Sequence, residues 1–409
     1  MRQWLQWPRF NATNALPEQR LSRQAFVALF IHGCFQFGAS MSGLFLNLYL
    51  WRLTEDLVVN GIFNIIVYGV TPFAFAVGGW IAKKRDRMVT YRLGIAMIAI
   101  FYLSVIIAQE QVVTYYPLFG FFNGFALGLY WIGYLVLMYD VTDVRNRSRY
   151  LGINMIVFNS AGLAGPALAG FLISQFDGLR GYIITFTAAT CLFALASLFS
   201  FRIPRIQAHH RTFFLKFSGL MMKRSKLWLM SLGGFFVLGL FQGMMLFLPN
   251  ILMYHVVGRE DQVGYLAVFF ALVTIGTGLF IARRRGEPRI RRDLLVSTLL
   301  ILLATLVLLV DIQLWSVIVF MVVYSFLAPL IVNTLTSYYY RIMDVLPLRG
   351  QFRIESVVVR EFFLNVGRVI SILMQVMFAA SVDAIALPII LVMLAATQLV
   401  IPVMVRERV

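Results

Sequence analysis

Long apolar runs separated by short polar segments fill almost the whole chain. A helix that crosses a bilayer needs about 20 apolar residues, and reading each run from one charged cluster to the next gives twelve such segments. The runs are continuous rather than alternating, which favours membrane helices over barrel strands. The predicted spans are 24–50, 58–81, 90–109, 112–139, 150–175, 181–201, 227–254, 262–282, 294–312, 314–340, 354–380 and 384–405.

Composition agrees with a multi-pass membrane protein. Of 409 residues, 60% are hydrophobic and only 13% are charged, whereas about a quarter of a soluble domain is charged. The two cysteines, Cys34 and Cys191, lie inside apolar runs. A disulfide scaffold and a cysteine-based zinc site are therefore excluded.

The charge of +17 is explained by membrane topology. With the N-terminus placed inside, 30 of the 35 Lys and Arg residues fall in one set of loops and three in the other, while Arg360 and Arg368 lie within a span. Such a bias predicts that both termini are cytoplasmic. We therefore expect no nucleic-acid partner; the basic loops face anionic membrane lipids instead.

The longest internal loop divides the chain into two six-helix halves. Residues 1–201 form the first predicted bundle, 202–226 a cytoplasmic central loop, and 227–409 the second bundle. Basic triplets after the second and eighth spans, 83–85 and 283–285, are offset by 200 residues, as expected for related halves. Apolar residues at helical spacing from Phe213 to Met221 predict an amphipathic helix on the inner leaflet; a plain flexible linker is the alternative.

Motifs of enzymes and ATP-driven pumps are missing. There is no Gly-x-x-x-x-Gly-Lys-Ser/Thr phosphate loop, no His-Glu-x-x-His pair and no Gly-x-Ser-x-Gly elbow. None of the four histidines has a second ligand at useful spacing, so no metal site is expected. His32 is either a hydrogen-bonded residue inside a helix or a cavity-lining group that titrates. The sequence favours a transporter over an enzyme.

The fifth span carries a row of small residues around a proline. Ala161, Gly165 and Ala169 recur every four positions, which lets a neighbouring helix approach closely, and Pro166 can bend the helix. With Gly152 and Gly170 the row resembles the fifth-helix signature of exporters of the major facilitator superfamily, Gly-x8-Gly-x3-Gly-Pro-x2-Gly-Gly. The resemblance covers essentially the whole chain and implies two six-helix bundles working by alternating access.

Other signatures of this family are altered in the chain. The loop after the second span usually reads Gly-x-x-x-Asp-Arg-x-Gly-Arg and takes part in a cytoplasmic gate. Here it begins at Gly79, has Lys83 at the acidic position, and continues to Asp86 and Arg87. The resemblance therefore leaves the gating pair in doubt or moves it to Asp86.

Two further departures concern coupling and the junction of spans four and five. Where proton-driven exporters carry Arg-x-x-Gln-Gly, this chain has Gly120-Phe-Phe-Asn123-Gly124, so a coupling ion cannot be inherited from the family. Charged residues at the junction either latch the inner gate or form a solvated loop. They include Asp140, Asp143 and Arg147.

The eleventh span places charges deep in the membrane. Glu361, Asn365 and Arg368 are spaced i, i+4 and i+7 and share one helix face. Measured from Arg353 at 1.5 Å per residue, Glu361 lies about 12 Å deep and Arg368 about 22 Å. Such charges face a bundle interior or a watery cavity. Glu361 is either a proton carrier or part of a fixed ion pair with Arg368; Arg360, on a different face, snorkels or pairs between helices.

Polar residues in other spans complete the set of candidate substrate or coupling residues. Each is as well explained by contacts between helices, and most aromatic residues by packing against lipid. Spans three, six and nine are nearly free of amide side chains, which matches the family's outer supporting helices. The candidates are His32, Gln36, Asn64, Asn123, Asn159, Gln242 and Asn333.

We therefore expect an all-α secondary transporter of the plasma membrane that acts as a monomer. The exporter-like motif favours efflux of an amphipathic, drug-like small molecule by antiport. No cofactor is expected beyond a coupling proton or sodium ion. Uptake of a small organic anion held by Arg368, lipid translocation and a transport-silent receptor are the alternatives.

Overall fold

Every regular element of the computed structural model is a helix over the residues it describes, which are 21–142, 146–204, 213–283, 290–345, 353–378 and 386–406. The predicted all-α membrane fold is confirmed. Each predicted span coincides with a helix or with a broken pair of helices. We call residues up to 204 the N half and those from 213 the C half.

The N half contains six long helices joined by tight turns. Asp56 and Asp86 end two of these turns, where their Oδ1 atoms accept hydrogen bonds from the N–H groups of Val58 (2.7 Å) and Met88 (3.0 Å). Such caps satisfy backbone donors that a helix start leaves open. The elements are α1 (Arg23–Thr54), α2 (Leu57–Lys84), α3 (Arg87–Ala108), the 3-10 turn η2 (Gln109–Val112), α4 (Tyr116–Asp140), α5 (Arg147–Ser174) and α6 (Arg180–Ser200).

The C half differs in having broken helices. The seventh predicted span is interrupted at Leu246–Phe247, two residues before Pro249, and the twelfth is interrupted by a short 3-10 turn at Gln398–Val400, two residues before Pro402. Proline lacks the N–H that would continue the helix, which explains both interruptions. The elements are α7 (Leu215–Arg224), α8 (Lys226–Met245), α9 (Leu248–Val257), α10 (Glu260–Arg283), α11 (Ile290–Val307), α12 (Leu314–Val345), α13 (Arg353–Phe378), α14 (Ala386–Thr397), η3 (Gln398–Val400) and α15 (Ile401–Met404).

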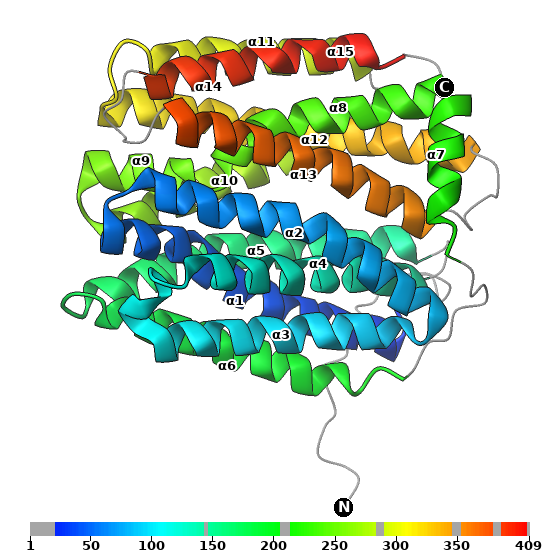
Figure 1. Ribbon diagram of the computed structural model, residues 1–409, viewed down its shortest axis with the longest axis horizontal. Helices are drawn as coiled ribbons and strands as arrows, with labels where there is room; N and C mark the ends of the chain where they lie inside the picture. The colour runs from blue at the N-terminus through cyan, green and yellow to red at the C-terminus, as the bar shows by residue number, and fades with distance from the viewer. Residues whose placement is uncertain are drawn as a thin grey trace, which may run out of the picture.

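The long helices lie side by side, with α3 and α6 at one edge of the molecule and α11, α14 and α15 at the other (Figure 1). The short helix α7 crosses one end of this array, and α9 lies at the opposite end. We call these the α7 end and the α9 end. Our topology prediction assigns the α7 end to the cytoplasm.

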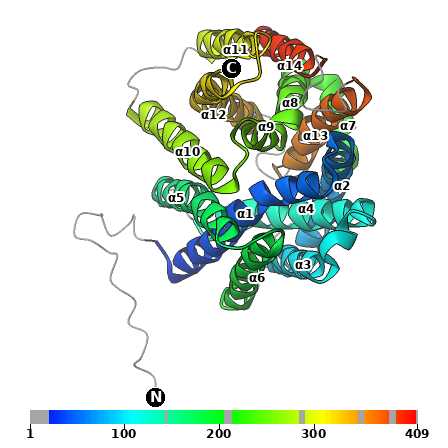
Figure 2. The same ribbon diagram turned by 90° about the vertical axis from the view of Figure 1, so that its left-hand side faces the viewer.

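The hydrophobic core consists of two large clusters, one in each half. The first runs from Leu21 to Ile203 and the second from Met221 to Val405, with Leu57 of α2 joined to the second. A small third cluster joins α2 and α4 to Val357 and Val358 of α13. The halves meet mainly where α2 packs on α13 and α5 on α10, and the view from the α9 end shows α1, α9 and α10 near one another (Figure 2).

Ten segments of the described chain are long and apolar enough to cross a membrane. The predicted spans that fall outside this set are α11 and α13. The first turn of α11 carries Arg291, Arg292 and Asp293, and α13 carries five charged residues. The count of twelve spans therefore stays a prediction.

Candidate functional site

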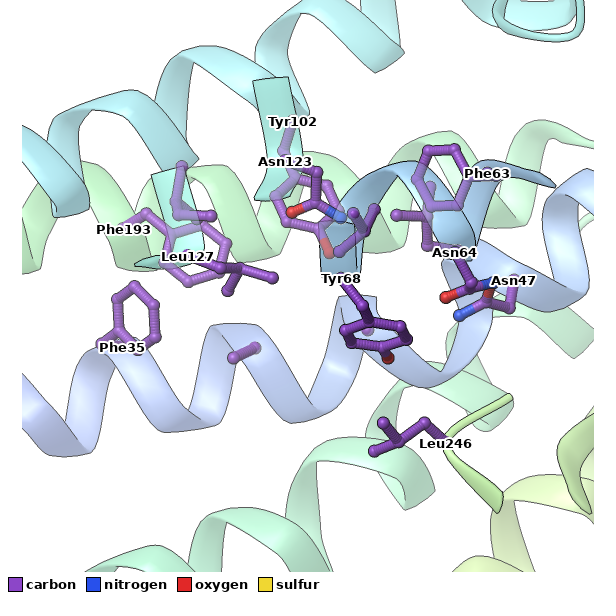
Figure 3. Close-up of a pocket in the computed structure, with 15 residues that line it drawn as sticks. Phe35, Asn47, Phe63, Asn64, Tyr68, Tyr102, Asn123, Leu127, Phe193 and Leu246 are labelled. Atoms are coloured by element: carbon purple, nitrogen blue, oxygen red, sulfur yellow. The ribbon is translucent and has the colours of Figure 1, made fainter. Parts of the chain in front are cut away.

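A cavity of about 240 Å³ lies between the helices, mostly within the N half. Two side chains at its wall are hydrogen-bonded to each other: Nδ2 of Asn64 donates to Oδ1 of Asn47 (2.7 Å). Figure 3 shows Tyr68 at the middle of the site, with Tyr102 and Asn123 on one side and Leu246 on the other. The full lining is Phe35, Ala39, Gly43, Leu46, Asn47, Phe63, Asn64, Val67, Tyr68, Ile98, Tyr102, Asn123, Leu127, Phe193 and Leu246.

This lining differs in part from the sequence prediction. Asn64 and Asn123 line the cavity as expected. The outer helices α3 and α6 contribute Tyr102 and Phe193, although the sequence assigned these helices to support only. An apolar wall with aromatic rings and a few amides is typical of sites for small organic molecules.

Several predicted residues lie elsewhere. The Nδ1 atom of His32 is hydrogen-bonded to the hydroxyl of Tyr130 (2.7 Å), and its ring stacks on Tyr134 with centroids 3.8 Å apart. Gln36 is buried, Asn159 is partly exposed and Asn333 is exposed. None of these four predicted residues lines the cavity. The contact with Tyr130 supports the interpretation of His32 as a hydrogen-bonded residue within its bundle.

The charged face of α13 is built differently from the prediction. Glu361 does not pair with Arg368. Its Oε1 accepts a hydrogen bond from Nη2 of the adjacent Arg360 at 2.5 Å, because these long side chains can bend along the helix despite starting from different faces. Arg360 also lies over the ring of Phe235, 5.4 Å from its centroid.

Arg368 is surrounded by neutral groups. It donates from Nη1 to Oδ1 of Asn365 (3.1 Å) and from Nη2 to Oε1 of Gln242 in α8 (3.0 Å). Asn365 in turn donates to the backbone carbonyl of Glu361 (2.7 Å). The shared face predicted for Glu361, Asn365 and Arg368 is thus present, and Gln242 joins it. The guanidinium carbon lies 5.3 Å from the ring centroid of Tyr68, so this face lies directly beside the cavity wall.

A buried ion pair joins the halves at the α7 end. Lys83 of α2 pairs with Glu355 of α13, and the two side chains are 5% and 0% exposed. Glu355 Oε1 also accepts a hydrogen bond from the backbone N–H of Phe214 (2.8 Å), just before α7. A Cβ at Gly79 would lie only 3.1 Å from Ile354 Cγ2 and 3.3 Å from Phe213 Cε2. Glycine here lets the three elements meet.

The altered gate motif takes part in an ion pair, and whether that pair gates transport stays a prediction. The lysine at the family's acidic position does not abolish an ion pair; the pair is present with Glu355 as its acid. Asp86, to which the gating role was provisionally moved, caps α3. Glu355 lies inside a segment that we singled out, yet its role was missed because its partner is 272 positions away.

A second ion pair joins the halves at the α9 end. Arg52 of α1 pairs with Glu260 of α10, with side chains 32% and 15% exposed. The hydroxyl of Tyr182 donates to the same Glu260 oxygen (3.3 Å), and Arg52 lies 5.6 Å from the ring centroid of Tyr254. The only signal for this pair in the sequence is two charges in loops on the same predicted side.

The small residues of α5 serve two different contacts. A Cβ at Gly165 would lie 2.1 Å from Ser40 Oγ of α1, and that hydroxyl donates to the carbonyl of Ala161 (2.7 Å). A Cβ at Gly170 would lie 3.0 Å from the carbonyl oxygen of Glu260 in α10. The motif therefore packs α5 within the N half and against the C half.

Some residues of the predicted gate lie outside the described part of the structure. Asp143 is outside the described residues. Arg87, Arg147 and Gly152 lie in α3 and α5, but the structure does not describe the surroundings of these three residues. Asp140 is the last residue of α4 and is partly buried. Whether these residues latch the gate stays a prediction. Among the described residues, no group of three or more His, Cys, Asp or Glu side chains is placed to hold a metal ion.

The sequence is similar to a known protein family and to two known proteins. The family model described as Major Facilitator Superfamily matches residues 69–351. Uncharacterized protein YqgE of Bacillus subtilis (strain 168) is 29% identical over 353 residues, which are 86% of this chain and 82% of that protein. An uncharacterized protein from the sodM 3' region of Geobacillus stearothermophilus is 32% identical over 175 residues, 43% of this chain and 82% of that protein.

Solved transporters share the architecture at low identity. The D-xylose-proton symporter has a TM-score of 0.70 and 11% identity, covering 94% of this chain and 98% of the symporter. The nucleoside transporter NupG has a TM-score of 0.68 and 16% identity, covering 93% and 98%. At these identities the similarity establishes the fold and carries no information about cargo.

Proposed function

The chain belongs to the Major Facilitator Superfamily, and on that premise we propose that it exports a small amphipathic organic molecule by alternating access. Membership makes it a secondary transporter rather than an enzyme. The observation that carries the mechanism is the pair of ion pairs between the halves, Lys83–Glu355 at the α7 end and Arg52–Glu260 at the α9 end. The cavity lies mostly within the N half.

In the proposed cycle, the two halves rock about the cavity and open one end at a time. Opening the α7 end separates Lys83 from Glu355 and lets water reach both charges. Opening the α9 end separates Arg52 from Glu260. Both pairs are formed together in this structure.

Several features support the choice of cargo and direction. The cavity wall combines the rings of Phe35, Tyr68, Tyr102 and Phe193 with amide groups, which suits an amphipathic molecule. Its volume of about 240 Å³ favours a small molecule over a two-chain lipid. The proposed direction, export, is based on the resemblance of the small-residue row in α5, with Gly165, Pro166 and Gly170, to the exporter signature. We further propose that the α7 end faces the cytoplasm of a plasma membrane and that α7 contacts inner-leaflet lipids.

Coupling to a proton or sodium gradient is part of the proposal. The pair between Arg360 and Glu361, whose side chains are 11% and 12% exposed, favours a fixed structural role for Glu361 over a carrier role. Glu361→Gln separates the two. A carrier predicts folded protein that binds cargo and loses gradient-driven transport. A structural pair predicts loss of folded protein, partly restored by Arg360→Gln in the same chain.

The test of the proposed function is reconstitution. Purified protein in proteoliposomes, given an imposed pH or sodium gradient and a panel of amphipathic compounds, should move at least one compound faster than protein-free vesicles. Dissipating the gradient should slow that movement. Failure with every compound under both gradients would contradict the proposal. Impermeant thiol reagents should label a cysteine at Arg259 from outside cells and one at Lys84 only after permeabilisation.

A further inference from the structure

Several charges inside the described helices take part in ion pairs. Lys83 pairs with Glu355, Arg52 with Glu260 and Arg360 with Glu361. Arg368 takes part in none of the ion pairs found among the described residues, although it lies about two turns further along α13 than Glu361, near the depth of the bilayer centre. A cation at that depth costs several kcal/mol unless it is paired or hydrated.

The environment of Arg368 leaves part of its hydrogen-bonding capacity unused. Its contacts with Asn365 and Gln242 each use one N–H of a different Nη atom, while Nε is buried and has no partner. A guanidinium has five N–H donors in a planar fork and stays charged in proteins. The two amide oxygens fix the orientation of this fork without neutralising its charge.

Arg368 lies next to the cavity because it contacts Tyr68, which forms part of the cavity wall. Tyr68 is at the middle of the cavity wall (Figure 3), and its ring faces the guanidinium, whose carbon is 5.3 Å from the ring centroid. A rotation of the Tyr68 side chain would bring the cavity contents and the guanidinium together. A positive charge held beside an aromatic wall is suited to a molecule with an apolar ring and an anionic group.

We propose that the transported molecule is an aromatic or otherwise apolar carboxylate, with its carboxylate bound to the guanidinium of Arg368 and its apolar body between Tyr68, Tyr102 and Phe193. This inference rests on the proposed function and names the substrate class of its cavity. The carboxylate would take up the Nε–H and a remaining Nη–H in the two-point geometry that arginine forms with carboxylates. It would also neutralise the charge of the guanidinium.

The test compares acids with their neutral amides. Phenylacetate, indole-3-acetate and naphthalene-2-acetate are each titrated against the corresponding acetamide, using the full chain in lipid nanodiscs and the midpoint of thermal unfolding as readout. We expect at least one acid to bind about 10- to 100-fold more tightly than its amide, the range expected for a charge-assisted contact. Acetate alone should bind far more weakly because it lacks the apolar body.

Variants assign that preference to Arg368. Arg368→Gln should bring acid and amide to within about twofold of each other while amide binding persists, and Arg368→Lys should keep part of the preference because it keeps the charge. Arg341→Gln, on the exposed surface of α12, should behave as the parent. If Arg368→Gln does not fold, the comparison of Arg368→Lys with the parent decides.

Equal binding of acids and amides by the parent overturns the inference, as does an acid preference that persists in Arg368→Gln. Absence of binding by all three acids also overturns it. The proposed function fails separately: acid preference without gradient-driven movement in proteoliposomes contradicts transport and supports the binding site. Transport of neutral compounds without acid preference supports the function and overturns the inference.

Discussion

The two halves are joined at both ends of the molecule by the same kind of interaction in different environments. At the α7 end, Lys83 and Glu355 are 5% and 0% exposed, and Glu355 also holds the backbone before α7. At the α9 end, Arg52 and Glu260 are 32% and 15% exposed. Removing one partner of a buried pair costs about 3–5 kcal/mol, whereas an exposed pair contributes about 1 kcal/mol or less. The α7 end is therefore the more firmly closed.

This difference has a mechanistic consequence. Opening the α7 end must separate two buried charges and also break the contact between Glu355 and Phe214, so three elements move together. Opening the α9 end separates charges that water already reaches. We expect thermal fluctuations to open the α9 end more often, and opening of the α7 end to depend on energy from cargo or ion binding.

The largest expected effect comes from Lys83→Met. Glu355 would remain buried without its cation, which favours opening of the α7 end by about 3–5 kcal/mol. In a background with Cys34 and Cys191 replaced by serine, a cysteine at the buried Val358 should react with a maleimide at least about 100-fold faster. Lys84→Met, at an exposed neighbouring position, is the matched control. Unchanged labelling of the Lys83 variant would contradict the latch.

Exchanging the two charges tests the same ion pair in a second way. The double variant Lys83→Glu, Glu355→Lys should recover slow labelling at position 358, since the two charges are again opposite. The exchange leaves the N–H of Phe214 without its carboxylate acceptor, so recovery should be partial. Faster labelling in the double variant than in Lys83→Met would mean that the two positions do not interact.

A larger side chain between α5 and α10, near the α9 end, should have the next largest effect. In Gly170→Leu the new side chain would meet the backbone of Glu260 and Gly264 in α10, and overpacking of this kind costs about 1–3 kcal/mol. A cysteine at Leu57, buried near the α9 end, should react about 10-fold faster. The control is Gly162→Leu, because a Cβ at Gly162 meets nothing within 4 Å. Equal effects of the two substitutions would contradict this account of the α5–α10 contact.

The smallest expected effect is that of Arg52→Gln. This partly exposed pair should contribute about 1 kcal/mol or less, which corresponds to about a fivefold faster reaction at Leu57→Cys. Salt screens exposed pairs more than buried ones, so 1 M salt should remove most of the difference between Arg52→Gln and its parent. The effect of Lys83→Met should persist in the same salt. If 1 M salt leaves the difference between Arg52→Gln and its parent unchanged, the pair at the α9 end is not the more exposed and weaker one.

The sequence predicted the helices better than their charged contacts, for a physical reason. The thickness of the bilayer dictates span length, so apolar runs give the helices directly. The breaks before Pro249 and Pro402 were missed, because proline is often tolerated within membrane helices. The family resemblance drew attention to the loop after α2, but the lysine at the acidic position left the gating pair in doubt or moved it to Asp86. The acid that pairs with Lys83, Glu355, could be assigned only once α2 and α13 were seen side by side.

The α13 face shows a similar limit. The spacing of Glu361, Asn365 and Arg368 correctly placed them on one face, because helical periodicity is local. It could not show that Arg360 would take Glu361 as its partner, since side-chain flexibility outweighs the nominal difference in direction. Nor could it show Gln242, which comes from α8. The cavity wall was predicted only in part because rings from α3 and α6 reach it.

Distances across both ends would show whether the two ends open in alternation and whether the buried pair holds the α7 end together. Spin labels at the exposed positions Arg85 and Arg341 report the α7 end, and labels at Gln111 and Gln313 report the α9 end. In nanodiscs, electron–electron double resonance on Lys83→Met should show longer distances across the α7 end and unchanged or shorter ones across the α9 end. Lengthening at both ends together, or at neither, would contradict the account.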